Sequence, residues 1–263
     1  MSVLQAALLG LVQGFCEFLP VSSSGHLVLL QNVFGISEGA LFFDTMLHLG
    51  TLFAVIFVYR KTVGEMLRHP FRKYPMYIIL ATVPTIVITL LLRGFIEESY
   101  SGQLLGWGFL ITAVLLFSTD RLSAGLSGKR RIDKMRPGHA LLIGAAQGLA
   151  VFPGVSRSGA TISGGLFCSL DREFAAEFAF MMSIPAILGA TVLQAVDLAK
   201  TGVSSVDWLP LLVGMAVAFV SGIFAIRWML SIVKKGKLGW FALYTAVLGI
   251  LVLVDRYLTH IFF

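Results

Sequence analysis

Two short segments hold most of the residue types that could do chemistry in this chain, and the two resemble each other. Residues 10–25 (GLVQGFCEFLPVSSSG) and residues 144–159 (GAAQGLAVFPGVSRSG) align without a gap at an offset of 134, and 8 of the 16 positions are identical. The chain has 263 residues, so the offset is about half of its length. The sequence therefore predicts a duplicated protein that repeats this polar, Gly- and Pro-broken segment once in each half.

The two copies differ where the side chains are most reactive. The differing pairs are Glu17 and Val151, Ser23 and Arg157, and His26 and Ala160. We expect the shared positions to build the same turn twice. The differing positions then divide the chemistry, with an acid, a hydroxyl and an imidazole in one copy and a permanent positive charge in the other.

In the first copy, Glu17 is the strongest candidate for a catalytic group. It lies deep in an apolar segment, where a carboxylate is costly and is a functional candidate by default. Gln13 precedes it by four residues and shares its helix face. Ser23 does not recur in the second copy, so we prefer it as the nucleophile. His26, which follows the serine cluster, is a further catalytic candidate. Arg157 of the second copy is the fourth.

In the second copy, the break between the two apolar arms is typical of an anion site. Arg157 can hold phosphate with two parallel hydrogen bonds, and the following helix should offer free N–H groups and the positive end of its dipole. Serines that recur in both copies favour a role in the backbone of the turn. The residues predicted to bind phosphate are Ser22, Ser24, Gly25, Gly154, Ser156, Arg157, Ser158 and Thr161, with Gln13 and Gln147 in support.

The composition places these segments in a lipid bilayer. Hydrophobic residues make up 57% of the chain and charged residues 13%, which is about half the charged share of a soluble domain. The net charge of +6 could indicate nucleic acid, but most of the basic residues cluster in loops between apolar segments. We therefore exclude nucleic acid as a partner and expect a bilayer.

The predicted fold is an all-α integral membrane protein built as an inverted-topology repeat. Each half has one re-entrant hairpin, at 3–35 and 139–170, whose arms are too short to cross a bilayer comfortably. Three spans follow each hairpin, so the second half begins on the opposite face from the first. The predicted spans are 41–59, 75–93, 103–120, 174–196, 207–227 and 238–258. The halves are 1–121 and 139–263, joined by a basic cytoplasmic linker at 122–138.

Charge gives this topology an orientation. The arrangement puts 16 of the 20 Lys and Arg residues on one face, which the positive-inside rule makes cytoplasmic. Both termini are then outside, the first hairpin opens outward and the second opens inward. Asp44 and His48, four residues apart near the outer end of a span, are weaker candidates that could line an outward cavity or only support the structure.

The same segments resemble the signatures of the undecaprenyl-pyrophosphate phosphatase family of the bacitracin-resistance type. Gln13 to Glu17 with Pro20 to His26 matches the family's first motif, and Pro153 to Thr161 matches its second. The resemblance covers nearly the whole chain. It implies hydrolysis of undecaprenyl diphosphate to the monophosphate and phosphate, which recycles the lipid carrier of cell-wall synthesis and gives bacitracin resistance. It also implies a bacterial inner-membrane location.

The resemblance further implies a divalent cation, Mg²⁺ or Ca²⁺. Glu17, aided by Gln13, is the candidate ligand, and we expect most other ligands to come from the substrate phosphates. Where some family members have a first Glu, this chain has Gln13, which argues against a mechanism that needs two carboxylates there. A second copy of the chain is a candidate partner beside the lipid substrate.

Two questions stay open from the sequence. The nucleophile is Ser23, His26 as a phosphohistidine, or water activated by Glu17 or His26. The alternative function is a polyprenyl-phosphate transporter, since inverted repeats with broken helices at the membrane midplane are a transporter architecture.

Overall fold

The computed structural model describes residues 1–36, 40–99, 102–123, 128, 130–201 and 207–262, and every regular element within these ranges is helical. The helices are α1 (Val3–Phe18), α2 (Ser23–Phe34), α3 (Ala40–Val58), α4 (Arg60–Arg68), α5 (Lys73–Leu91), α6 (Arg93–Ser99), α7 (Leu105–Ser123), α8 (Pro137–Leu149), α9 (Arg157–Phe167), α10 (Arg172–Thr201), α11 (Trp208–Lys235), α12 (Gly239–Val254) and a terminal π-turn (Asp255–Thr259).

Six of these helices are long and apolar enough to cross a membrane, in agreement with the prediction of six spans. They are α3, α5, α7, α10, α11 and α12. The largest difference from the predicted bounds is at α11, which continues from 227 to Lys235 because its last turns are capped by Gly236 in the left-handed conformation. Basic side chains at Lys234 and Lys235 suit that end, where the helix dipole is negative.

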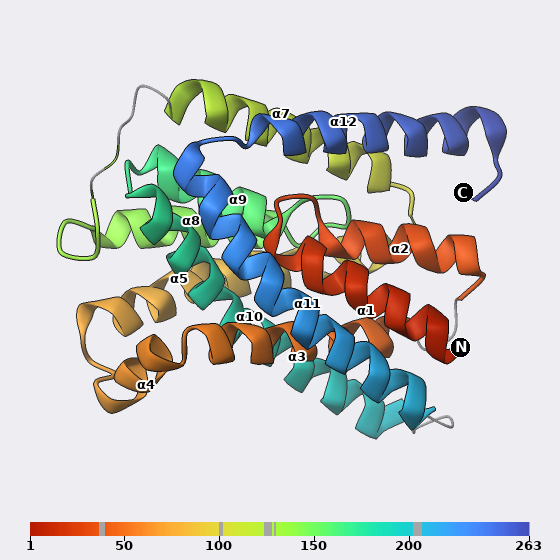
Figure 1. Cartoon of the computed structure of the whole chain (residues 1–263), viewed down its shortest axis with the longest axis horizontal. Helices are drawn as coiled ribbons and strands as arrows, with labels where there is room; N and C mark the ends of the chain where they lie inside the picture. The colour runs from red at the N-terminus through yellow and green to blue at the C-terminus, as the bar shows by residue number, and fades with distance from the viewer. Residues whose placement is uncertain (37–39, 100–101, 124–127, 129, 202–206, 263) are drawn as a thin grey trace.

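Both predicted re-entrant segments form helix hairpins. Helices α1 and α2 are joined by residues 19–22, and α8 and α9 by residues 150–156. In Figure 1 the first hairpin starts and ends near the end of the molecule where both chain termini lie. The second hairpin starts and ends at the opposite end, beside α4. The two turns therefore approach each other from opposite ends and meet in the middle of the molecule.

Each hairpin packs against a long helix from the other half of the chain. Helix α1 packs along α11, and α8 packs along α5. The contact is backbone to backbone: a Cβ added at Gly10 would lie 2.3 Å from the Gly214 carbonyl oxygen, and one added at Gly144 would lie 1.9 Å from that of Ala81. This close packing explains why Gly10 and Gly144 recur in the repeat.

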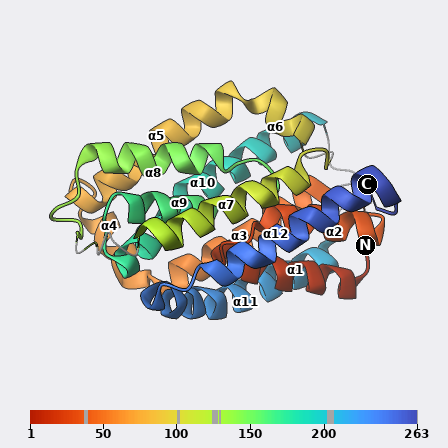
Figure 2. The same cartoon turned by 90° about the horizontal axis from the view of Figure 1, so that it is seen from above.

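Helices from the two halves of the chain also contact each other at α7 and α12. Helix α7 lies along α12 at the top of Figure 1, and Figure 2 shows the same pair side by side. Asp120 of α7 accepts hydrogen bonds from the Leu238 and Gly239 backbone N–H groups at 3.1 and 2.6 Å, so α7 caps the start of α12. The site at the two turns is thus held by helices from both halves.

Candidate functional site

The tips of the two hairpins are in direct contact. Ser158 Oγ donates to the Leu19 carbonyl oxygen at 3.0 Å, which joins the second turn to the first. A Cβ added at Gly25 would lie 3.0 Å from the Gly154 backbone. Gly154 itself has a φ of 88°, in the left-handed region that favours glycine. Two glycines that the sequence assigned to phosphate binding therefore let the turns touch.

The two turns share one pattern of serine capping, although Ser22 has a φ of 70° and Ser156 has an extended backbone with a φ of -77°. Ser22 Oγ accepts from the Gly25 N–H at 3.3 Å, and Ser156 Oγ accepts from the Gly159 N–H at 3.0 Å. Each serine is the N-cap of the helix that follows it. In both turns the serine two residues after the cap, Ser24 or Ser158, contacts the capping hydroxyl. The backbone role predicted for the recurring serines is what this geometry shows.

The caps leave an electropositive surface between the turns. Helices α2 and α9 both begin there, so the unpaired N–H groups of their first turns and the positive ends of their dipoles lie at the meeting point. Neither first turn contains an acidic residue. Two helix N-termini together form a surface suited to phosphate.

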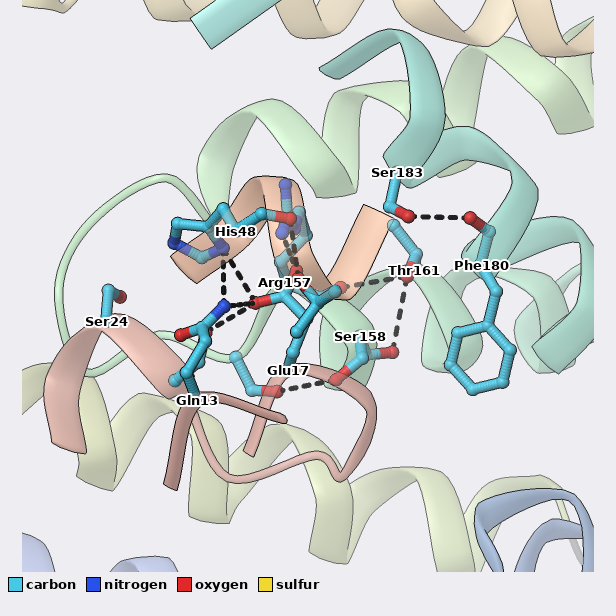
Figure 3. A network of polar contacts seen from close by, with 12 residues as sticks. Gln13, Glu17, Ser24, His48, Arg157, Ser158, Thr161, Phe180 and Ser183 are labelled. Carbon is cyan, nitrogen blue, oxygen red and sulfur yellow. Dashed lines mark hydrogen bonds and ion pairs between the residues drawn. The ribbon is translucent and has the colours of Figure 1, made fainter. Parts of the chain in front are cut away.

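Glu17 is the centre of the side-chain network between the turns (Figure 3). Its carboxylate forms an ion pair with Arg157 from the opposite hairpin, and it accepts from Ser23 Oγ at 2.7 Å. The side chain of Glu17 is 2% exposed. Because a buried charge needs a partner, removing one member of such a pair costs about 3–5 kcal/mol. Of the residues that differ between the two copies, Ser23 and Arg157 therefore both bind Glu17.

Gln13 and His48 complete the network around the carboxylate. Gln13 Nε2 lies 3.1 Å from Glu17 Oε2 and 2.7 Å from His48 Nδ1, and His48 Nδ1 lies 3.2 Å from Glu17 Oε2. One amide nitrogen has two hydrogens, so Gln13 can donate to both neighbours when His48 is neutral and accepts at Nδ1. The amide oxygen of Gln13 is buried without a partner among the described residues.

This network forms one wall of a cavity of about 660 Å³. The two turns line it with Glu17, Ser23, Ser24, Ser156, Arg157 and Ser158. Helices α3, α5 and α10 supply further lining residues, all from the halves of these helices that lie toward the chain termini. The cavity therefore combines a floor of serine hydroxyls and the Glu17–Arg157 pair with sides that mix polar residues, such as Asp44 and His48, with apolar ones.

The amino-acid sequence of this chain is similar to those of known proteins. The profile of a family described as bacitracin resistance protein BacA matches residues 6–251. An undecaprenyl-diphosphatase of Carboxydothermus hydrogenoformans is 45% identical over 257 residues, which cover 97% of each chain. Undecaprenyl-diphosphatase 4 of Bacillus thuringiensis (strain Al Hakam) is 41% identical over the full length of both chains.

The chain belongs to the BacA family. It is a multi-pass membrane protein, since six of its described helices are long and apolar enough to span. A Methanobrevibacter smithii relative named undecaprenyl-diphosphatase is 36% identical over the full length of both chains. The similarity therefore extends over both hairpins and all six candidate spans.

In this BacA family member, three further predicted site residues make their contacts outside the Glu17 network: His26, Thr161 and Gln147. His26 is buried, with Nδ1 2.7 Å from the Ser22 carbonyl oxygen and Nε2 2.7 Å from the Tyr244 hydroxyl. Thr161 donates to carbonyl oxygens of its own helix. Gln147 donates to Thr85 Oγ1 at 3.2 Å. Their predicted roles in catalysis and binding stay predictions, but their contacts are those of residues that hold the turns.

Two residues that contribute to the site were not assigned to it from the sequence. His48 was only a weak candidate, and its four-residue spacing from Asp44 was the available signal. Thr112 had no signal: its hydroxyl donates to the Gly154 carbonyl oxygen at 2.8 Å and accepts from the Ser156 N–H at 2.9 Å. It holds the second turn from α7, a contact that depends on how distant helices pack.

A divalent cation has few protein ligands at this site. Within the described ranges there is no group of three or more His, Cys, Asp or Glu residues arranged to hold a metal ion. Glu17 lines the cavity and offers a carboxylate, whereas Gln13 has an unpartnered amide oxygen but is not among the residues that line the cavity. One carboxylate fits an oxygen-liganded cation such as Mg²⁺ that takes most of its ligands from substrate and water.

Proposed function

We propose that this protein hydrolyses undecaprenyl diphosphate to undecaprenyl monophosphate and inorganic phosphate. The decisive observation is that one buried carboxylate, Glu17, binds Ser23 of its own turn and Arg157 of the opposite turn in the same cavity. The full-length relatives carry the name of this activity. The reaction would return the lipid carrier of cell-wall synthesis and lower sensitivity to bacitracin.

The diphosphate binds at the two helix N-termini in this proposal. Arg157 turns from Glu17 to the terminal phosphate, while the first N–H groups of α2 and α9 and the Ser24 hydroxyl hold the remaining oxygens. Phosphoryl transfer needs positioning and neutralisation of charge more than covalent help from the protein. The site supplies both without a P-loop.

Ser23 is the nucleophile that the geometry supports best. Its hydroxyl gives its proton to Glu17, Oγ bonds to the terminal phosphorus, and the bond from that phosphorus to the bridging oxygen breaks to release undecaprenyl monophosphate. Water then attacks the phosphoserine and releases phosphate. The rival, His26, has both ring nitrogens engaged by Ser22 and Tyr244. Direct attack by water activated by Glu17 is the second alternative.

A bound cation would neutralise charge on the diphosphate oxygens. Glu17 is the residue that would hold it. With only one carboxylate, the protein's share of the ligands is small. Mg²⁺ and Ca²⁺ are both compatible with this oxygen donor.

We also propose that the fold is an inverted repeat of the halves 1–121 and 139–263. The packing of α1 on α11 corresponds to that of α8 on α5 when the halves are exchanged, and the α7–α12 contact corresponds to itself. The basic α4 lies at the end opposite both termini. These features support a topology in which the basic loops are cytoplasmic and both chain termini are outside. In this topology the cavity opens toward the outer face of the inner membrane.

A polyprenyl-phosphate transporter is the second candidate function. Hairpins that enter from opposite ends and meet at the centre favour it. The one-sided placement of Glu17, Ser23 and His26 favours an enzyme, because a carrier needs no nucleophile. Lipid transport in liposomes by a variant that cannot hydrolyse the diphosphate would support the transporter.

The experiment for the phosphatase is phosphate release from undecaprenyl diphosphate by purified protein in detergent. Arg157→Ala should lower kcat/KM by about 10³-fold or more, the scale of an arginine that stabilises a transferring phosphoryl group. Arg157→Lys keeps the charge but loses the two-pronged geometry, so its activity should be intermediate. Wild-type activity in Arg157→Ala would contradict the proposed site.

A further inference from the structure

A second cavity lies on the other side of the second turn. Its volume is about 560 Å³, and apolar residues, glycine and proline line it. One wall is α7, with Ile111 and Leu115, and the other is formed by α8 and α9, with Leu142, Ala146 and Phe167. We call it the α7–α8 groove.

The groove is open at the side of the helix bundle. Ile111 is 56% exposed and Leu142 is 51% exposed, and in a membrane protein such side chains face hydrocarbon. Small, buried residues also line it, namely Gly108, Ala160 and Gly164. The groove therefore provides an apolar recess that a chain in the bilayer can enter.

The groove adjoins the phosphate cavity at the second turn. Ala150 and Val155, on either side of the second turn's apex, line both cavities. Val155 directly precedes Ser156 and Arg157, which line the polar side. A molecule with a charged head at Arg157 and a long apolar tail would pass this point in crossing from one cavity to the other.

We propose that the α7–α8 groove binds the part of the polyprenyl chain next to the diphosphate. This inference rests on the proposed phosphatase function and adds the place of the tail. The groove meets the requirements of that tail: it is apolar, open to the hydrocarbon and next to the head site, with which it shares Ala150 and Val155. The tail stays in hydrocarbon while the diphosphate reaches the two helix N-termini.

The test is to fill the groove and measure the kinetics with undecaprenyl diphosphate. Ile111→Trp and Leu142→Trp should raise KM about tenfold with kcat unchanged, the pattern of lost binding that is equal in ground and transition state. Inhibition by inorganic phosphate, which has no tail, should keep its wild-type constant.

The chain offers a matched control for each variant. Val114 on α7 is 67% exposed and Leu141 on α8 is 41% exposed, and neither lines the groove. Val114→Trp and Leu141→Trp add the same bulk to the same helices and should leave KM unchanged. Equal KM in groove and control variants would overturn the proposal that the groove binds the tail. Absence of wild-type turnover would instead overturn the phosphatase.

A labelling experiment keeps the proposal testable if a variant fails to fold. A polyprenyl diphosphate with a photoreactive group on an early isoprene unit is irradiated with the wild-type protein. Peptides of α7, α8 and α9 should be labelled, and excess undecaprenyl diphosphate should prevent it. Labelling of α5 and α10 alone, on the far side of the phosphate cavity, would overturn the proposal. So would labelling that excess substrate does not reduce, because it marks bulk lipid contact.

Discussion

The three serines at the first turn occupy neighbouring positions but make different contacts. Ser22 caps α2 through the Gly25 N–H, and Ser24 contacts that cap. Ser23 instead donates to Glu17. The repeat alone indicated this division, because only Ser23 changes in the second copy.

Ser23→Ala should lower kcat by at least about 10³-fold, because it removes the proposed nucleophile. Ser24→Ala is the matched control at the next position. It removes one hydroxyl from the cavity and should cost much less. Phosphate release measures both, and rapid quenching of wild type with labelled substrate should trap phosphoserine. Robust turnover by Ser23→Ala would transfer the role to His26 or water.

His48 is a positioning residue in this site. When its Nδ1 carries no proton, it accepts from the Gln13 amide, which also donates to Glu17. His48→Leu leaves that amide hydrogen unpaired, so we expect kcat to fall by about 10–100-fold, the scale for residues that orient functional ligands. His48→Gln restores a hydrogen-bond partner and should recover part of kcat. Wild-type kcat in His48→Leu would exclude this role.

At the scale of helices, recurring glycines set how closely each hairpin packs. Gly144→Ala places a methyl group 1.9 Å from the Ala81 carbonyl oxygen, so α5 and α8 must separate. Overpacking of this kind costs about 1–3 kcal/mol, and the apparent melting temperature of the purified protein should fall.

Gly138→Ala is the control on the same helix. A Cβ at Gly138 meets nothing within 4 Å, so its melting temperature should match wild type or rise slightly. Equal melting temperatures for Gly144→Ala and Gly138→Ala would contradict the close packing of α8 on α5.

At the scale of the whole molecule, the proposed topology predicts which positions are reachable from outside the cell. Single cysteines would be introduced after Cys16 and Cys168 are changed to serine. A membrane-impermeant maleimide should label Leu4→Cys and Thr259→Cys on intact cells. Leu67→Cys and Lys235→Cys should react only after the membrane is opened. Labelling of Leu4→Cys and Leu67→Cys from the same side would contradict the inverted arrangement.

The sequence by itself predicted the helical membrane class, the six spans and the two broken hairpins, and it singled out Glu17 and Arg157 as candidates for catalysis. These features follow from local properties: apolar length, Gly and Pro breaks, and charged residues whose burial is too costly without a function. A duplicated segment added a comparison within one chain, which separated turn-building from reactive positions.

Only the tertiary structure decided which polar residues meet. His48 reaches Glu17 because α3 packs beside α1, and His26 turns to Tyr244, 218 residues away, because α12 lies beside α2. Thr112 holds the second turn for the same kind of reason. Spacing along one helix predicts a shared face, but the partner of that face depends on how helices from both halves interleave. The same packing leaves the α7–α8 groove open beside the phosphate cavity.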